Sequence, residues 1–444
     1  MMRLLSLAIA VLVLSSPVPA QQPAVVSAGE FRIGGGETVA ADHGHFTVPV
    51  NRHRPESGSM TLRFVRFRST AARPGAPIVF LAGGPGDAAT RAFAGLPRTF
   101  LDPLRAIADV IAFDQRGTGT SGPRVLCPPG AAQSLDAPLD PAALVSSMTA
   151  ALAVCLPRLA VEGIDIAGFT TEESADDVDD LRKAIGARQI MLLGGSYGTH
   201  LALSVARRHP DAVARMALLG VEGPDDTIKR PSGPESALTE IDRVHPGLVT
   251  SLRTLIARLS AEPWTKTLPG GQRVTVGAWD LQRRVADALD TTREIEALVP
   301  AVAGMMGGDY SDLVRWTIPF RAARPINVMN LAMDCASFAS PARLRDVRAG
   351  HSTTLLGAAM NAPLPDVCAA PGLPRLPDSF RAPRVSRVPA LLVAGTWDGR
   401  TPPANAHAAA SRMTNAEVLI VPRGSHGLFQ EASVLDAVLR FLAR

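Results

Sequence analysis

The sequence has 444 residues, of which 46% are apolar and 19% are charged. This length allows two or three domains, or one domain that carries a large insertion. The apolar content supplies a sizeable buried core and excludes a mainly disordered chain. The formal net charge is only +4, and like charges do not cluster in long runs, so the sequence does not indicate a dedicated nucleic-acid-binding surface.

Residues 1–20 have the pattern of a signal peptide. Arg3 supplies a positive start, residues 4–14 form an apolar stretch too short to span a bilayer, and residues 18–20 (VPA) form a small-residue cleavage site. We therefore expect an exported protein, periplasmic or secreted. No later run of apolar residues is long enough for a membrane span and no cysteine follows the cleavage site. We thus expect no stable membrane anchor after signal cleavage.

The next part of the chain begins with a β-rich segment and continues with strands that alternate with helices. Residues 46–50 and 60–65 are typical of strands between polar turns. Further strands are predicted at 77–82, 109–113, 190–193 and 212–219, and helices at 174–185, capped by Ser174, and at 197–209. This alternation predicts an α/β fold with a mostly parallel sheet covered by helices on both faces.

The alternation stops after residue 224 and resumes at residue 385. Between these positions helices are predicted at 246–259, 278–289 and 293–306; beyond them, strands at 389–394 and 417–421 precede an amphipathic helix at 432–442. We therefore expect a core domain in two segments, 21–224 and 385–444, with a mostly helical cap at 225–384 inserted between them.

Residues 194–198 (GGSYG) match the nucleophile-elbow pattern G-x-S-x-G. They follow a predicted strand and precede a predicted helix, which is where this pattern places a catalytic serine. The glycines matter because side chains would clash in so sharp a turn. This context favours Ser196 as the nucleophile over an ordinary tight turn. It also places the backbone N–H of Tyr197 where it can face a developing oxyanion.

A serine nucleophile needs a base, and the base needs a carboxylate. In this kind of fold the chain order is serine, acid, histidine. Asp398 follows the strand at 389–394, and His426 follows the strand at 417–421, so both lie in loops at the carboxyl ends of strands. His407, in a predicted helix, and His200, behind the nucleophile, fit the role of base less well.

Residues 83–86 (GGPG) follow another predicted strand. They lack the Gly-Lys-Ser/Thr ending of a phosphate-binding loop, so a nucleotide site is not indicated. We instead expect this loop to supply the second oxyanion donor, a backbone N–H of Gly83 or Gly84, with Gly84 preferred.

The four cysteines, Cys127, Cys155, Cys335 and Cys368, would meet an oxidising compartment after export. Four cysteines allow three pairings. We favour Cys127–Cys155 and Cys335–Cys368, because each joins near neighbours in sequence. The alternative is four buried free thiols, while a zinc site needs tighter spacing.

Together these motifs resemble the prolyl aminopeptidase and tripeptidyl aminopeptidase family of α/β-hydrolases, especially its exported bacterial branch. The matching stretches are residues 81–86 (LAGGPG), 114–119 (DQRGTG), 194–199 (GGSYGT), and Asp398 with 401–406 (TPPANA). The resemblance implies an α/β-hydrolase fold, a Ser196–Asp398–His426 triad, a helical cap over the site, and hydrolysis next to a free peptide N-terminus.

An aminopeptidase also needs a carboxylate that holds the substrate's ammonium group. The first candidate is Glu222, which leaves the sheet beside the expected pocket; the others are Glu235, Asp309 and Asp334. The cap matches the family less clearly, because residues 336–338 (ASF) follow Cys335 where exported relatives often carry acidic residues.

The leading hypothesis is an exported serine hydrolase that releases one to three residues from peptide N-termini through an acyl-enzyme. It requires no metal and no organic cofactor, and its partner is a peptide with a free N-terminus. The alternative is a carboxylesterase on the same triad, because the fold alone does not set the leaving group. A non-catalytic binding protein is a third interpretation, against which the complete triad counts.

Overall fold

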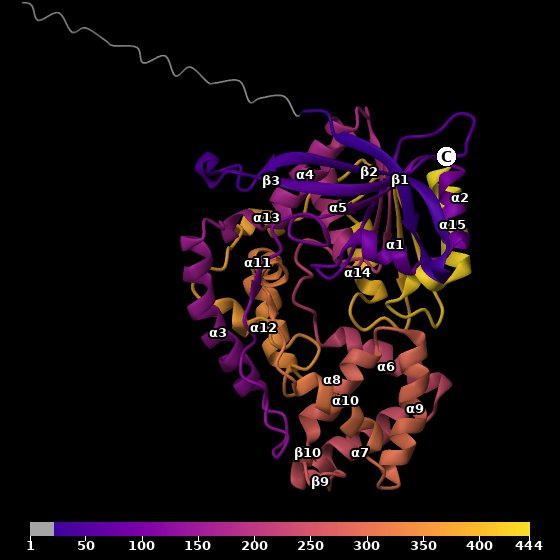
Figure 1. Cartoon of the computed structure of the whole chain (residues 1–444). Coiled ribbons are helices and arrows are strands. Elements are labelled where there is room, and N and C mark those ends of the chain that lie inside the picture. The colour runs from indigo at the N-terminus through magenta and orange to yellow at the C-terminus, as the bar shows by residue number, and fades with distance from the viewer. Residues whose placement is uncertain (1–21) are drawn as a thin grey trace, which may run out of the picture.

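The computed structural model describes residues 22–444, so the signal peptide predicted at 1–20 lies outside the described residues. The fold is built on a nine-stranded sheet with the strand order β1-β2-β3-β5-β4-β7-β8-β12-β13. Figure 1 shows this sheet in the upper part of the view. Its strands are β1 (Val25–Arg32), β2 (Thr38–Pro49), β3 (Ser59–Phe67), β4 (Ile78–Leu81), β5 (Val110–Asp114), β7 (Ile190–Gly195), β8 (Val213–Leu219), β12 (Ala390–Gly395) and β13 (Ala416–Val421).

The sheet is antiparallel at one edge and parallel elsewhere. β1 pairs antiparallel with β2, β2 with β3, and β3 with β5. From β5 onward every neighbouring pair is parallel. The mostly parallel sheet predicted from the sequence is confirmed, and the carboxyl ends of β4, β7, β8, β12 and β13 all lie at one edge.

Successive side chains of the central strands point alternately to the two faces of the sheet. In β4, Val79 and Leu81 belong to one hydrophobic cluster, whereas Ile78 and Phe80 belong to the other. Helices cover both clusters, because a parallel sheet has two apolar faces to bury. One face carries α4 (Thr171–Ala184), α5 (Tyr197–Arg208) and α14 (Pro403–Ala410), and the other carries α1 (Ala89–Gly95), α2 (Arg98–Arg105) and α15 (Ala432–Leu442).

Helix α4 begins earlier than predicted. Its N-cap is Thr170, whose side chain accepts the backbone N–H of Glu173 at 3.3 Å. Ser174, the predicted cap, lies inside the helix and is buried. The prediction was wrong because residues 170–173 (TTEE) carry the earlier T-x-x-E signal, which places a hydroxyl and a carboxylate at the helix start.

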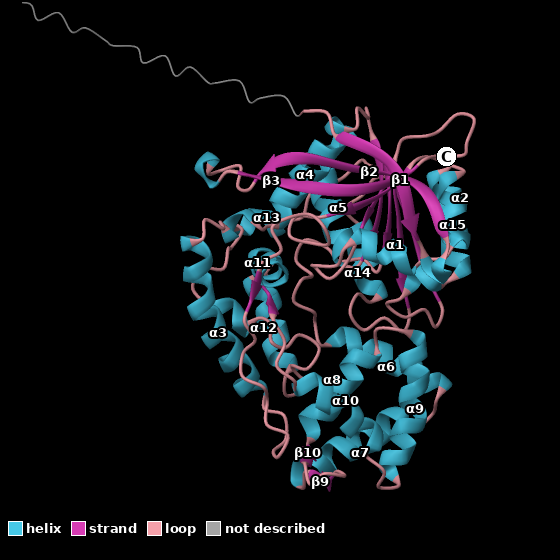
Figure 2. Cartoon of the chain, in the orientation of Figure 1, coloured by secondary structure: helices cyan, strands magenta, loops and turns pink. Residues whose placement is uncertain are grey.

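The chain leaves the sheet after β8 and returns at β12. Between them it forms α6 (Ser232–Val244), α7 (Leu248–Ala261), α8 (Ala278–Ala288), α9 (Thr292–Met306), α10 (Ser311–Arg321), α11 (Val328–Ser337), α12 (Pro341–Gly350), α13 (Asp378–Arg381) and a hairpin of β9 (Trp264–Thr267) and β10 (Arg273–Val276). Figure 2 shows α6 to α10 grouped apart from the sheet. This group has its own hydrophobic core, to which Trp397 from the loop after β12 contributes.

Helix α3 (Pro141–Val161) is absent from the predicted elements. Ser146, Ser147 and Thr149 interrupt its apolar run, which hides it from a count of consecutive apolar residues. Within residues 22–444 it is the one helix long and apolar enough to cross a membrane, with a mean hydropathy of 1.7 over a stretch that is 22% buried. The expectation of no membrane anchor after signal cleavage stays a prediction, because length and hydropathy alone do not show that this helix enters a membrane.

The structure contains the two disulfides that the sequence predicts. Cys127–Cys155 joins β6 (Leu126–Cys127) to α3, with the Cα atoms 5.7 Å apart, and Cys335–Cys368 joins α11 to a short helix at Asp366–Ala369, with the Cα atoms 5.3 Å apart. β6 also pairs with β11 (Ile326–Asn327) at the start of α11. Segments before and after the elbow are therefore tied together on the cap side of the molecule.

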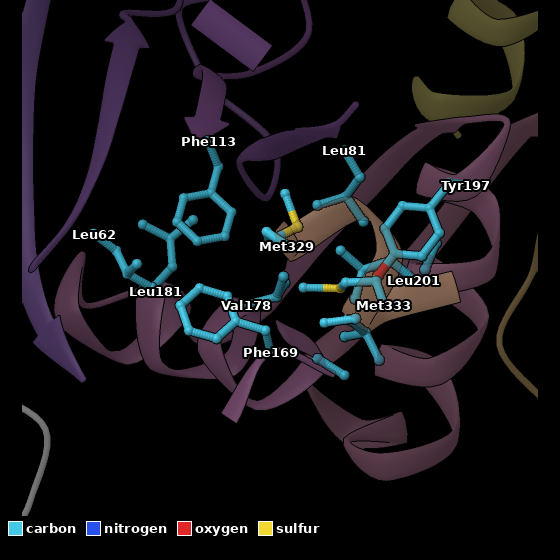
Figure 3. Close-up of a cluster of buried hydrophobic side chains, with 14 of the residues drawn as sticks. Leu62, Leu81, Phe113, Phe169, Val178, Leu181, Tyr197, Leu201, Met329 and Met333 are labelled. Atoms are coloured by element: carbon cyan, nitrogen blue, oxygen red, sulfur yellow. The ribbon is translucent and has the colours of Figure 1, made fainter. Parts of the chain in front are cut away.

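Helix α11 attaches the cap to the core. Its Met329 and Met333 lie in the same hydrophobic cluster as Leu81 and Tyr197 (Figure 3). Tyr197 Oη lies 2.8 Å from Met333 Sδ and 3.0 Å from Thr171 Oγ1. The residue that follows the predicted nucleophile thus contacts the cap directly.

Candidate active site

Ser196 lies in a strained turn between β7 and α5. Its φ of 53° and ψ of −125° are values that non-glycine residues seldom adopt, at a cost of about 1–3 kcal/mol. A Cβ on Gly194 would lie 2.6 Å from the carbonyl oxygen of Gly198, and a Cβ on Gly198 would overlap the carbonyl oxygen of Leu81. The Ser196 N–H donates to the Leu219 carbonyl oxygen at 2.9 Å. The turn therefore has the sharp, glycine-dependent geometry expected of a nucleophile elbow.

Asp398 and His426 lie side by side in the loops that follow β12 and β13. His426 Nδ1 donates to Asp398 Oδ2 at 2.9 Å. Asp398 is fully buried, and its Oδ1 accepts the backbone N–H groups of Arg400 and Thr401, each at 2.8 Å. Burial opposes ionisation, but His426 and Thr401 outweigh it and lower the pKa of Asp398 to about 2. The carboxylate is thus ionised and holds the imidazole in one orientation.

Because its pKa is lowered in the folded state, ionised Asp398 contributes to the free energy of unfolding, and this contribution disappears at acid pH. The folded value of about 2 lies below the ordinary value of 3.8. The stabilisation is therefore present above pH values near 4 and is lost as the pH falls toward 2, and it corresponds to about 2 kcal/mol. In urea unfolding we expect Asp398→Asn to be less stable than wild type at neutral pH, with the difference shrinking in acid. A difference that stays constant between pH 6 and 2 would contradict this interpretation.

Thr401 supports the same pair, a role that no motif indicated. Its Oγ1 donates to Asp398 Oδ2 at 2.6 Å and lies 3.0 Å from His426 Nδ1. Both side chains pack on the backbone after β8: a Cβ on Gly220 would lie 3.0 Å from Thr401 Oγ1 and 3.2 Å from His426 Cε1. The sequence signal is that a hydroxyl residue, Thr401, lies three positions after Asp398. At this spacing an aspartate side chain can accept hydrogen bonds from the backbone of the turn that follows it.

The loop at residues 83–86 passes directly over the nucleophile turn. A Cβ on Gly83 would lie 3.1 Å from Ser196 Cβ, so a larger residue would crowd the serine. Gly84 has a φ of 105°, a conformation that favours glycine. Tyr197 begins α5, and the first N–H groups of a helix have no acceptor within it. The loop that carries Gly84 and the start of α5 at Tyr197 therefore both lie next to Ser196, and their role as oxyanion donors stays a prediction.

A cavity of about 740 Å³ opens at this point, and Ser196, His426 and Gly84 all line it. Ligand sites in proteins typically measure about 300–1,000 Å³. The Ser196 hydroxyl makes no hydrogen bond to the chain between residues 22 and 444, and contacts between nucleophile and base are often long before a substrate binds. Nucleophile and base thus share one solvent-accessible space.

Charged side chains line the rest of this cavity. They are Asp87, Arg91, Arg124, Asp290 and Arg400. Arg400 Nε donates to Asp290 Oδ1 at 2.8 Å, so these two charges are paired. Asp87 is exposed to solvent inside the cavity, but the surrounding protein atoms partly desolvate its carboxylate. This desolvation raises the pKa of Asp87. The positive charge of Arg91 opposes the rise, and the negative charge of Asp290 adds to it.

Glu222, the expected amine-binding residue, does not line the cavity. Its buried carboxylate forms an ion pair with Lys229 Nζ, which also donates to the Asp226 carbonyl oxygen at 3.1 Å. Burial would raise the pKa of Glu222, but the charges of Lys229 and His200 lower it below its ordinary value. An ammonium group of the protein itself therefore occupies the position in which we expected the ammonium group of a substrate.

The other three candidate carboxylates also lie outside the cavity lining. Glu235 accepts the backbone N–H of Leu355, and Asp309 accepts the N–H of Ser311 at 2.9 Å. Burial and the nearby charge of Glu222 raise the pKa of Asp334 well above its ordinary value. None of these three carboxyl groups therefore lines the cavity that contains Ser196.

Curated relatives that match part of the chain carry peptidase names. Serine protease Hip1 of Mycobacterium tuberculosis is 28% identical over 190 residues, which are 41% of this chain and 36% of the relative. Tripeptidyl aminopeptidase of Streptomyces lividans is 30% identical over 193 residues, 41% of this chain and 35% of the relative. Proline iminopeptidase of Arabidopsis thaliana is 29% identical over 147 residues, 33% of this chain and 27% of the relative. The match spans about a third of these relatives, and the resemblance stated from the sequence is confirmed.

Solved structures with a similar chain path include proline iminopeptidase of Mycobacterium smegmatis, with a TM-score of 0.39 and 17% identity over 90% of this chain and 97% of that chain. An esterase from Exiguobacterium antarcticum has a TM-score of 0.40 and 13% identity over 87% of this chain and 96% of that chain. A family model described as alpha/beta hydrolase fold matches residues 76–433, well over half of the sequence. The chain therefore belongs to the alpha/beta hydrolase fold family.

Proposed function

We propose that this protein is a serine hydrolase with a Ser196–His426–Asp398 triad. The observation that carries the proposal is the shared cavity: Ser196, in an elbow turn, and His426 both line it, and buried Asp398 accepts the Nδ1–H of His426. These are the parts that nucleophilic catalysis by serine requires, in the chain order typical of this fold.

In the proposed mechanism, Ser196 Oγ attacks the substrate carbonyl while His426 Nε2 accepts the serine proton. The N–H groups of Gly84 and Tyr197 stabilise the tetrahedral oxyanion. His426 then protonates the leaving group, and the acyl group stays on Ser196. A water molecule, deprotonated by His426, attacks the acyl-enzyme and releases the acid. Asp398 holds the imidazole and stabilises its cationic form throughout.

We further propose that the substrates are peptides with a free N-terminus, from which one to three residues are released after export. The peptidase names of the relatives support a peptide substrate, and the cavity volume suits a short peptide. Two disulfides and the signal-peptide pattern support an oxidising compartment outside the cytoplasm. A carboxylesterase with the same triad is the alternative function.

The residue that would bind the substrate's ammonium group is one of two carboxylates. Glu222 fits this role only if Lys229 is displaced. Asp87 lines the cavity, follows the oxyanion loop, and has no cation within ion-pair distance between residues 22 and 444. We therefore favour Asp87 over Glu222 for amine recognition.

A panel of peptides and esters tests the substrate class. Each fluorogenic peptide is assayed with a free and with an acetylated N-terminus, beside short-chain neutral esters. We expect acetylation to lower kcat/KM by about tenfold or more, because it removes the charge that a carboxylate would pair with. Asp87→Asn should reduce the ratio of free-peptide to ester hydrolysis. Equal cleavage of free and acetylated peptides would exclude an aminopeptidase, and hydrolysis of esters alone would identify a carboxylesterase.

A further inference from the structure

We infer that Arg91 and Arg124 bind a carboxylate of the substrate, namely the free C-terminal carboxylate of a short peptide. The inference rests on the proposed hydrolase function of the same cavity. It adds a second recognition element, for a negatively charged group of the substrate, beside the element proposed for the positively charged ammonium group. It also limits the preferred substrates to peptides short enough to lie within the cavity.

The two arginines line the cavity from different parts of the chain. Arg91 lies in α1, directly after the oxyanion loop. Arg124 lies in the loop before β6, the strand that pairs with β11 of the cap. Both line the cavity together with Ser196. A substrate bound at the serine would therefore have one guanidinium on the core side and another where the core meets the cap.

Neither guanidinium forms an ion pair within the described chain, although the charge of Arg91 acts on nearby Asp87 from beyond ion-pair distance. Between residues 22 and 444, no carboxylate lies within ion-pair distance of Arg91 or Arg124, and neither makes a side-chain hydrogen bond. Arg400, the third arginine of the lining, differs because it is paired with Asp290. Most of the other arginines around the core pair with carboxylates or backbone carbonyls, as Arg116 does with Asp177. Two guanidinium groups without an ion-pair partner in the described chain thus line the cavity of the nucleophile and are available for an anion.

The chemistry of the site selects the kind of anion. A guanidinium presents a planar fork of N–H donors that matches the two oxygens of a carboxylate. A peptide short enough to fit a cavity of about 740 Å³ carries its own C-terminal carboxylate into that cavity. An acidic side chain of the substrate offers the same group, so the experiment must separate these two sources.

The test compares matched substrates with wild type and variants. The best free-amine tripeptide from the panel above is assayed as the C-terminal acid and as the C-terminal amide, with product release measured by chromatography. A second pair of amides carries Asp or Asn in the same position. Arg91→Gln, Arg124→Gln and the double variant are compared with Arg345→Gln, which replaces an exposed arginine of α12 without a partner in the described chain.

We expect wild type and Arg345→Gln to prefer the acid over the amide by about tenfold. Each single variant should lower that preference about three- to fivefold, and the double variant should bring it close to one. Added salt should weaken the preference in wild type, because exposed charges are screened. Thermal unfolding at the wild-type temperature would show that the variants remain folded.

Four results would overturn the inference. Equal loss for acid and amide would mean that the arginines act on structure rather than on the carboxylate. If the Asp peptide is preferred over the Asn peptide, but the C-terminal acid is not preferred over the C-terminal amide, the arginines recognise an acidic side chain instead of the C-terminus. Equal cleavage of acid and amide by wild type would reject the inference while the aminopeptidase proposal stands. If no peptide is cleaved and only esters are, the proposed function fails and the inference fails with it.

Discussion

Ser196→Ala should lower the turnover of every substrate by three or more orders of magnitude. The side chain is the proposed nucleophile, so the variant cannot form the acyl-enzyme; removal of a triad member typically leaves only the contribution of the oxyanion site and of binding. The fold should survive, because the Ser196 hydroxyl makes no hydrogen bond to the described chain. Alanine also relieves little of the backbone strain, since it still has a Cβ. Steady-state kinetics and urea unfolding measure the two effects separately.

A fluorophosphonate probe gives the matching chemical test. Wild type should be labelled at one serine, and Ser196→Ala should not be labelled. Ser411→Ala is the control, because that hydroxyl is exposed and bonds only to the Ala408 carbonyl oxygen. Labelling of the Ser196→Ala protein at another serine would reject the assignment of the nucleophile.

Lys229→Met should cost about 3–5 kcal/mol of unfolding free energy. The substitution leaves the buried carboxylate of Glu222 without its counter-ion, and breaking one side of a buried ion pair typically has this cost. The pKa of Glu222 is below its ordinary value with Lys229 present, and it should rise once the ammonium group is gone. The carboxyl group can then take up a proton in acid, so the stability difference from wild type should shrink as the pH falls.

The double variant Lys229→Met/Glu222→Gln should recover most of the lost stability, because it removes both charges together. Lys266→Met is the matched control, since Lys266 is exposed in β9. Kinetics of Glu222→Gln add a functional readout. If Glu222 is structural, free-amine peptides and neutral esters should lose activity equally. A selective loss of tens-fold for free-amine peptides, with unchanged stability, would instead restore Glu222 as the amine-binding residue.

The elements that depend on local pattern were predicted well from the sequence. The strand at 190–193 and the helix at 197–209 correspond to β7 and α5, because a buried parallel strand and an amphipathic helix each leave a signature in their own residues. The elbow between them is equally local: its glycines, its serine and its turn occupy five consecutive positions. The disulfide pairing followed from the short separation of the cysteines and the oxidising compartment.

The features that depend on long-range contacts could not be read in this way. Helix α3 buries only a short stripe near its C-terminal end, at Leu152, Cys155, Leu156 and Leu159, and a disulfide links it to β6, so its place is decided by tertiary contacts. Lys229 lies seven positions after Glu222, and nothing in that spacing shows that the two side chains meet in a buried ion pair. Asp87 and Arg124 have no distinguishing motif in the sequence, and only the folded arrangement of their loops brings them to the cavity that Ser196 lines.

The amino-acid order thus predicted the fold class, which is confirmed, and the three residues of the proposed triad, which stay a prediction. Each of these lies at the carboxyl end of a strand, and the edge of a parallel sheet brings such ends together whatever the details of packing. Which carboxylate is free to meet a substrate, and which is already neutralised, was decided by the tertiary structure alone. Charge pairing depends on separations of a few ångströms between side chains from distant segments, and this distance information is not contained in any local pattern.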